Sequence, residues 1–403
     1  MDSGHTLVPV SPSRILKARI AVSLLFLTNG AIYANLLPRL PEIKDIFELT
    51  NAMYGLVLIA LPIGGVVAGP LPAPIIRRFG TARAAAVGSV LLAGSVFFAA
   101  SIPHVAVFFV GLLLAGALDA VVDTAQNAQG LRVQRLAGVS IINSMHALWS
   151  VGAVLGGLMG TAAIALHLPL PLHLALSGVL FAAVALGAMR FSLPDSHEVP
   201  AEVMTDTAGV PIIPAGAGKA LLALVPFAVI AMSGVLVEDI GNNWGAVYLR
   251  DTLGAPVTVM GFAYVVMVSA QFIGRLLGDR MINAFGEVNI TRFGGALIFL
   301  GMGTVIIAAN VPMALVGFGL AGFGCATLVP SAYAAADRAP GLKPGTGLTL
   351  VSWSMRVIFL ISPPLVGALA DSVGLRLAIL FVPLMGLLAI VFARSLRIRG
   401  RGR

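Results

Sequence analysis

The sequence predicts an all-α membrane protein with twelve transmembrane helices in two pseudo-symmetric six-helix bundles. About a dozen apolar stretches of roughly 20 residues follow one another, and this is the length that a helix needs to cross a bilayer. Only 10% of the 403 residues are charged while 58% are hydrophobic, which leaves too little charge to cover a soluble protein of this size. The apolar stretches show no alternation of period two, and this excludes a β-barrel.

The hydropathy of the chain places the spans one after another. The first span is long and lacks a small-residue cleavage site, so we interpret it as a retained helix rather than a signal peptide. The twelve predicted spans are 15–37, 52–72, 84–101, 104–127, 140–163, 172–190, 220–243, 257–277, 290–309, 312–333, 346–369 and 375–394.

The basic residues indicate how these spans are oriented. An even number of spans puts both termini on one side, and 20 of the 25 Lys and Arg residues fall on that side, including Arg275 at the end of the eighth span. Because Lys and Arg concentrate in cytoplasmic loops, both termini are predicted to be cytoplasmic in a multi-pass protein of the cell inner membrane. The net charge of +8 is then the orientation signal and requires no nucleic acid as a partner.

The longest polar stretch divides the chain into two sets of six spans. It predicts an N-terminal bundle over 1–190, a cytoplasmic linker over 191–218 and a C-terminal bundle over 219–403. The halves also share residues at a nearly constant separation, which favours a duplicated six-helix unit. The pairs are Phe79-Gly80 with Phe285-Gly286, Gly116 with Gly322, and Gly157 and Gly160 with Pro364 and Gly367.

Two six-helix bundles joined by a cytoplasmic loop resemble the major facilitator superfamily, a family of transporters. In that superfamily the loop after the second span usually carries an acid followed by Arg and then Gly. Here Arg78 and Gly80 fit, but Arg77 stands at the acidic position, and the second copy has Asn283 there. A conformational latch that depends on this acid is therefore not expected.

A narrower resemblance lies in the fourth span, which reads Asp123-Thr124-Ala125-Gln126-Asn127. It is similar to the acid-Thr-x-x-Asn signature of fucose-permease-like sugar transporters, a branch that includes uncharacterised bacterial inner-membrane permeases. The resemblance implies that the acid takes part in proton coupling. Fucose permeases also carry an acid in the first span, whereas this chain offers Asn29 and Asn35 there, so fucose itself is not implied.

Two carboxylic acids lie within the fourth span, where an ionisable side chain costs about 2.5–3.5 kcal/mol. Asp119 and Asp123 are four residues apart, which puts them on one helix face with Asn127 another turn along. Two carboxylates about 6 Å apart repel each other when both are ionised, so such a pair can hold a proton and release it. We therefore predict proton coupling through these acids. The alternative is that one of them forms a fixed ion pair with Arg356.

Three further charged residues fall within predicted spans. Arg356 in the eleventh span is too deep to reach the interface easily, so it is expected either to bind an anionic or polyhydroxyl substrate or to form a fixed salt bridge. Glu238 and Asp239 lie in the outer third of the seventh span. One of them would face a central cavity, or both would form a solvated cap in the headgroup region.

Polar and aromatic residues complete the predicted substrate site. His146 and Trp149 form a polar stripe in the fifth span, and Trp353 lies one turn from Arg356 in the eleventh. Trp can stack on a sugar ring or bind a cation, although it is also a common interface anchor and His is often a packing residue. The predicted substrate-binding residues are Arg356, Asn127, Trp149, His146, Trp353, Asn29, Tyr33, Glu238, Asp239 and Gln126.

The remaining patterns argue against other classes of function. The chain lacks the motifs of metalloproteases, serine hydrolases and phosphate-binding loops, so neither an enzyme nor a metal or other cofactor is expected. The single cysteine, Cys325, excludes a disulfide framework. The sequence thus predicts a monomeric secondary active transporter that moves a small polar, sugar-like or anionic solute with protons. Na⁺ coupling, import against export, a proton-driven exporter of amphipathic drugs and a non-transporting sensor or scaffold are the alternatives left open.

Overall fold

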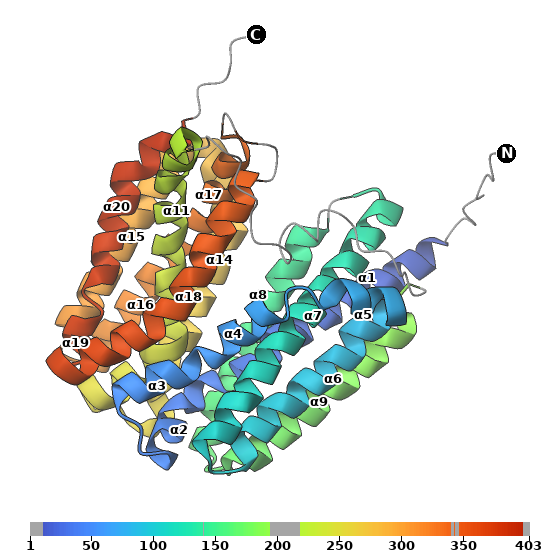
Figure 1. Ribbon diagram of the computed structural model, residues 1–403, viewed down its shortest axis with the longest axis horizontal. Helices are drawn as coiled ribbons and strands as arrows, with labels where there is room; N and C mark the ends of the chain where they lie inside the picture. The colour runs from blue at the N-terminus through green and yellow to red at the C-terminus, as the bar shows by residue number, and fades with distance from the viewer. Residues whose placement is uncertain (1–10, 140, 194–217, 340–341, 343–345, 398–403) are drawn as a thin grey trace, which may run out of the picture.

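A computed structural model describes residues 11–139, 141–193, 218–339, 342 and 346–397. Within these residues the chain is helical and contains no strand. Figure 1 shows two groups of helices that lean against each other at one end. The first group contains α1 (Pro12–Ala34), η1 (Leu37–Arg39), α2 (Leu40–Ile46), α3 (Asn51–Leu58), α4 (Ala60–Val67), α5 (Pro72–Phe79), α6 (Thr81–Ser101), α7 (Val105–Ala137), α8 (Ile142–Ala165) and α9 (Leu170–Phe191).

The second group has the same general plan. It contains α11 (Gly218–Asp239), η2 (Ile240–Trp244), α12 (Gly245–Val247), η3 (Tyr248–Thr252), α13 (Val257–Met260), α14 (Phe262–Phe285), α15 (Glu287–Ile307), α16 (Val311–Cys325), α17 (Leu328–Asp337), α18 (Thr346–Val373), α19 (Leu375–Ala378), α20 (Phe381–Phe392) and η4 (Ala393–Leu396). We call the groups the first bundle and the second bundle.

The described residues contain eleven continuous helical segments that are long and apolar enough to cross a membrane. A twelfth span is bent by 59° between Asn51–Val67 and Pro72–Phe79, where Pro70 and Pro72 interrupt the helical hydrogen bonds. Each of the twelve predicted spans corresponds to one of these segments. The predicted class, an all-α protein of twelve transmembrane helices, is therefore confirmed.

The repeated residues of the two halves occupy equivalent places. Gly80 ends α5 with φ 86°, and Gly286 ends α14 with φ 81°. Each donates its backbone N–H to the carbonyl four residues earlier, in both cases over 2.8 Å. Gly116 on α7 lies against the Leu61 carbonyl of α4, and Gly322 on α16 lies against the Met267 carbonyl of α14, so close that a Cβ would overlap with either oxygen. The predicted duplication is visible as the same contacts made twice.

The two bundles contact each other mainly through two helix pairs, α3 with α18 and α8 with α14. Gly55 of α3 lies against the Pro363 carbonyl of α18, and Gly367 of α18 lies against the Asn51 carbonyl of α3. Because glycine carries no Cβ, the two helices approach each other closely at these positions. In the second pair, Tyr264 of α14 packs on Gly157 of α8.

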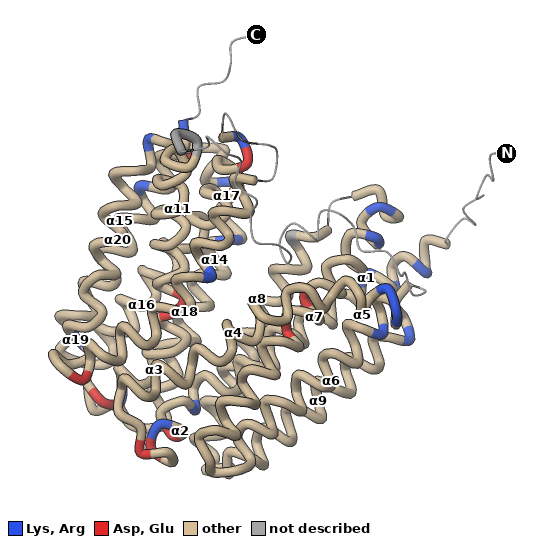
Figure 2. Tube along the Cα trace, in the orientation of Figure 1, with Lys and Arg blue, Asp and Glu red and all other residues tan. Residues whose placement is uncertain are grey.

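These contacts gather at the end of the molecule that contains η1, α2, α3, η3 and α13, which we call the closed end. Toward the opposite end the two bundles diverge (Figure 1). Figure 2 shows Lys and Arg concentrated at the diverging end, whereas the closed end carries acidic and basic residues side by side. The boundaries at 190 and 219 stay predictions, and most of the predicted linker lies outside the described residues.

Candidate functional site

Asp119 lies near the middle of α7 and is linked to two other helices. Its Oδ1 accepts a hydrogen bond of 2.7 Å from Nδ2 of Asn29 on α1. The Asn29 Oδ1 in turn accepts a 2.8 Å bond from Nε1 of Trp149 on α8. Because Asn29 is only 5% exposed, this amide is a fixed bridge that joins three helices. The structure thus brings together three of the predicted site residues.

Asp123 lies one turn further along α7 and is surrounded by amides. Its Oδ1 accepts bonds of 3.0 Å from Asn127 Nδ2 and 3.2 Å from Gln126 Nε2. His146 of α8 lies within electrostatic range of this carboxyl group, and its ring meets Phe26 edge-on at 5.1 Å between centroids. The predicted shared face of the two acids is present, because Asp119 and Asp123 lie four residues apart on the continuous helix α7.

The side chains of this group differ in exposure. Asp119 and His146 are exposed and Asp123 is half-buried, although all three lie within transmembrane segments. The Asn29 bridge ties Asp119 to Trp149 on α8, the helix that packs on the second bundle. Asp119 therefore faces the interior of the protein between the bundles and has access to solvent there. An exposed carboxylate in that position requires water rather than lipid around it.

In the second bundle, Glu238 is part of an ion pair. Its Oε1 accepts a 3.0 Å bond from Nη2 of Arg275 on α14, and a short bond from Nε2 of Gln271. Gln271 also lies 3.5 Å from the thiol of Cys325 on α16. The helical segment continues to Thr252, so Glu238 lies near its middle, where the ion pair with Arg275 forms.

Asp239, the next residue, points elsewhere and is 1% exposed. Its Oδ1 accepts a 2.8 Å bond from Nδ2 of Asn243, and the buried Ser362 hydroxyl of α18 lies beside the carboxyl group. Tyr33 of α1 and Tyr54 of α3 lie within electrostatic range of it. Asp239 therefore belongs to the junction between the bundles, and a solvated cap is wrong for it.

Arg356 and Trp353 form a pair on α18. The Arg356 guanidinium carbon lies 5.8 Å from the centroid of the Trp353 indole, within the range of a cation–π contact. Both side chains are half-buried. The predicted proximity of these two residues is present, and both also have further interactions. The alternative that Asp119 or Asp123 forms an ion pair with Arg356 stays a prediction.

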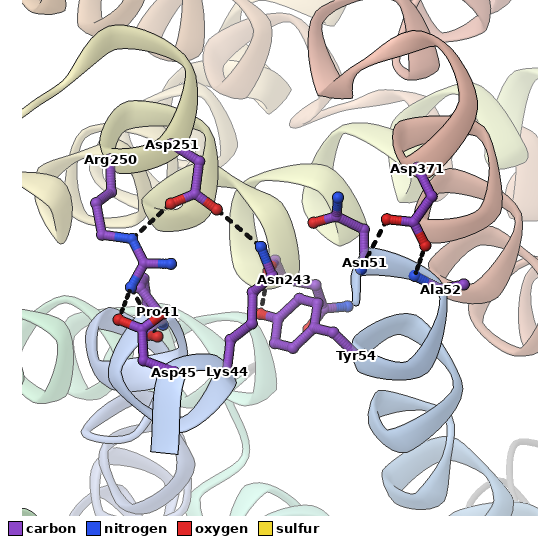
Figure 3. A network of polar contacts seen from close by, with 10 residues as sticks. All are labelled: Pro41, Lys44, Asp45, Asn51, Ala52, Tyr54, Asn243, Arg250, Asp251 and Asp371. Atoms are coloured by element: carbon purple, nitrogen blue, oxygen red, sulfur yellow. Dashed lines mark hydrogen bonds and ion pairs between the residues drawn. The ribbon is translucent and has the colours of Figure 1, made fainter. Parts of the chain in front are cut away.

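Polar contacts between the bundles close one end of the molecule (Figure 3). Lys44 Nζ lies 2.8 Å from Asp251 Oδ2, and Arg250 Nη1 lies 2.5 Å from Asp45 Oδ2 and 2.8 Å from the Pro41 carbonyl. Lys44 and Asp45 of α2 therefore each face a residue of opposite charge on η3. This arrangement resists sliding of one bundle along the other.

A second group of polar contacts lies beside the first. Asp371 near the end of α18 accepts backbone bonds of 2.9 Å from both Asn51 and Ala52, which begin α3. Tyr54 donates its hydroxyl to the Asn243 carbonyl over 2.6 Å. Since each of these bonds joins the first bundle to the second (Figure 3), the closed end is held by charged and neutral groups together.

The sequence patterns did not identify several of these residues as part of the site. Arg275 was counted with the basic residues at the cytoplasmic end of its span, yet it lies inside α14 and pairs with Glu238. Gln271 and Arg275 are four residues apart, so the spacing that joined Asp119 to Asp123 could have found them. Tyr54 gave no signal, because its partner is a backbone carbonyl. Among the described residues, no three His, Cys, Asp or Glu side chains are grouped as a metal site would need.

Comparison with known proteins gives three kinds of match. The family model described as Major Facilitator Superfamily matches residues 227–402. The uncharacterised transporter y4wD of Sinorhizobium fredii is 26% identical over 387 residues, which are 95% of this chain and 99% of the relative. A bacterial homologue of the human lysosomal transporter Spinster, inward-facing and unoccupied, superposes with a TM-score of 0.69 at 13% identity and covers 96% of this chain and 98% of that one.

The FucP transporter in its outward conformation superposes with a TM-score of 0.61 at 17% identity, over 96% of this chain and 100% of its own. These structural likenesses concern the fold. The family match in the second bundle and the relative that spans nearly the whole chain agree with it. The chain is thus similar to the major facilitator superfamily of membrane transporters in its fold, in the family match to its second bundle and in a relative that spans nearly its whole length.

Proposed function

We propose that this protein is a secondary active transporter that moves a small polar solute together with protons by alternating access. Asp123 and Asp119 are the proton-coupling residues. The solute binds between the bundles, against Asn29, Trp149 and Asn127 on one side and Arg356 and Trp353 on the other. The observation that carries the proposal is the exposed Asp119 carboxyl group in the middle of an apolar helix.

The surroundings of the two acids support proton exchange. Hydrogen-bond donors to Asp119 and Asp123 are neutral amides, which accept either protonation state at lower cost than a permanent cation at the same distance. His146 provides a second titratable group beside Asp123. Because one carboxylate disfavours ionisation of the other, a proton lost by one acid is held by its neighbour. Water that enters between the bundles completes the path.

The groups around the proposed site favour a polar solute. Asn29 Nδ2 and Trp149 Nε1 are already oriented by hydrogen bonds to Asp119 and to each other. The Trp353 indole with the Arg356 guanidinium over it presents a flat surface beside a cation. Stacking plus several amide, indole and guanidinium donors suits a sugar-like or anionic molecule. A drug exporter would instead need a large apolar surface in this place.

The proposed orientation has both termini in the cytoplasm, in keeping with the basic residues at the diverging end (Figure 2). The closed end then faces outside, and the structure represents an inward-open state. The higher TM-score with an inward-facing structure than with an outward one, 0.69 against 0.61, supports this assignment.

The test is flux into proteoliposomes, with a panel of sugars and organic acids and an imposed pH gradient. For the solute that accumulates, Asp123→Asn should abolish gradient-driven accumulation and leave counterflow exchange in place. Asn keeps the carbonyl oxygen that accepts from Asn127, so the fold is retained. Asn289→Asp, an exposed amide on α15 whose Nδ2 bonds the Phe285 carbonyl, is a matched control that should leave accumulation unchanged. Unchanged accumulation in Asp123→Asn contradicts the coupling role, and accumulation that follows a Na⁺ gradient alone contradicts proton coupling.

A further inference from the structure

We infer that Asp239 is a second protonatable site, which exchanges its proton only when the closed end opens and so links the outer pH to that opening. The inference rests on the proposed function for the direction of the membrane. It adds a carboxyl group in the second bundle to the acids of the first. The evidence is the place of Asp239 in the contacts between the bundles.

Asp239 is sealed at this junction. It is 1% exposed, and it lies between its own helix and residues of α1, α3 and α18. The buried Ser362 hydroxyl of α18 lies beside its carboxyl group as a further hydrogen-bonding partner. Asp119, in contrast, is exposed in the same structure. The two acids therefore have access to water in different conformations.

A chain of two hydrogen bonds connects Asp239 to the first bundle. Asn243 donates its Nδ2 to Asp239 Oδ1 and accepts at its backbone carbonyl from the Tyr54 hydroxyl. Asp239 thus orients the residue that receives the hydroxyl from the opposite bundle. Movement of α3 away from η2 breaks the Tyr54 bond and uncovers Asp239.

The groups that face Asp239 determine which protonation state this junction tolerates. They are Tyr33 from α1, Tyr54 from α3 and Ser362 from α18, with Asn243 from η2. Further along the junction, Arg250 and Asp251 of η3 act on Tyr54. Glu238 turns toward Arg275 instead, and Arg356 is six residues before Ser362, about 9 Å along α18.

Burial of an ionised carboxylate among neutral groups is far more costly than burial of the neutral acid. The closed junction therefore holds Asp239 in its protonated form. When the end opens, water reaches the carboxyl group and the ionised form is solvated. Loss of the proton to a more alkaline exterior then stabilises the open conformation, and uptake of a proton favours closure.

The test is a labelling experiment that needs no solute. Thr161 of α8 is 4% exposed and packs against Gly261 of the second bundle at the closed end. A Thr161→Cys variant is made with Cys325→Ser, Asp119→Asn and Asp123→Asn, so that the introduced thiol is the single label site and the acids of the first bundle are neutral. A membrane-impermeant maleimide is added to right-side-out vesicles at external pH 6 and pH 8.

We expect the ratio of the labelling rate at pH 8 to that at pH 6 to be about tenfold greater with Asp239 present than in the same chain with Asp239→Asn. The Asp239→Asn chain corrects for the pH dependence of the thiol's own reactivity. Release of one proton on opening can change the equilibrium between the closed and open conformations by at most about a hundredfold over two pH units. Asp239→Glu, which keeps an acid, should restore the pH response. Tyr54→Phe should raise labelling at both pH values and keep their ratio.

The same pH response with and without Asp239→Asn overturns the inference, and so does a response that Tyr54→Phe abolishes while Asp239 is present. If Asp239→Asn does not reach the membrane, Asp239→Ala removes the ionisable group with less demand on the junction. Failure of proton-coupled flux in the earlier experiment leaves this result unaffected, because labelling reports the opening directly.

Discussion

The first bundle holds Asp119 and Asp123 with amide donors, whereas the second bundle holds Glu238 with the guanidinium of Arg275. An amide stabilises a carboxyl group in both protonation states, while a permanent cation favours the ionised state. At these positions the same duplicated scaffold therefore carries exchangeable acids in one half and an ion pair in the other. The difference suggests that Asp119 and Asp123 couple transport to protons and that Glu238 has a structural role, whereas Asp239 of the second bundle acts at the closed end.

The largest expected effect concerns this contrast. Asp119→Asn should lower gradient-driven accumulation by at least about tenfold. This is the ratio of solute concentrations that a gradient of about one pH unit maintains across the membrane when one proton moves with one solute. Glu238→Gln should change accumulation by less than about fivefold, because its partner Arg275 is substantially exposed and such pairs contribute little. Both are measured in the proteoliposome assay. Equal losses in the two variants would remove the distinction between the bundles.

The second prediction concerns the contacts that the bundles share. Gly116→Ala in the first bundle and Gly322→Ala in the second should each lower the free energy of unfolding by about 3 kcal/mol, since a Cβ at either place overlaps with a backbone carbonyl. Gly94 and Gly303 have no atom within 4 Å of such a Cβ, so Gly94→Ala and Gly303→Ala are the matched controls. Unfolding in detergent by denaturant measures the loss. A loss in one bundle only would show that the repeat does not extend to packing.

The smallest predicted effect concerns the charged contacts across the closed end. Arg250→Ala removes contacts with Asp45, Asp251 and the Pro41 carbonyl together, and should raise maleimide labelling of Thr161→Cys by about fivefold, or about 1 kcal/mol. Lys44→Ala removes one ion pair and should raise labelling by less. Restoration by the exchange Lys44→Asp with Asp251→Lys would show that opposite charge is what matters. A greater effect of Lys44→Ala than of Arg250→Ala contradicts this ranking.

Much of the fold could be predicted from the chain. All twelve spans were located, because the cost of exposing backbone and polar groups to lipid acts on each segment separately. The repeated glycines, Gly80 with Gly286 and Gly116 with Gly322, could also be identified from their constant separation in the sequence. Each pair occupies equivalent places in the two bundles. The shared face of Asp119 and Asp123 followed from helical geometry alone.

Parts of the site could not be predicted in this way. The partner of Glu238 lies 37 positions away on another helix, and that of Asp119 lies 90 positions away. A solvated cap in the headgroup region was one of two alternatives for Asp239, because the end of the seventh span was placed about nine residues before the point where the helical segment ends. Errors of this kind arise where a span contains polar residues that protein, rather than lipid, surrounds.

The amino-acid sequence by itself determined that the chain crosses a membrane about twelve times in two related halves, because hydropathy, length and helical period are properties of local segments. The tertiary structure decided which acid meets an amide, which meets a cation and which is sealed between the bundles. It also decided which end is closed. These outcomes depend on how helices far apart in the chain pack together, and the local energies that place each helix in the membrane do not contain that information.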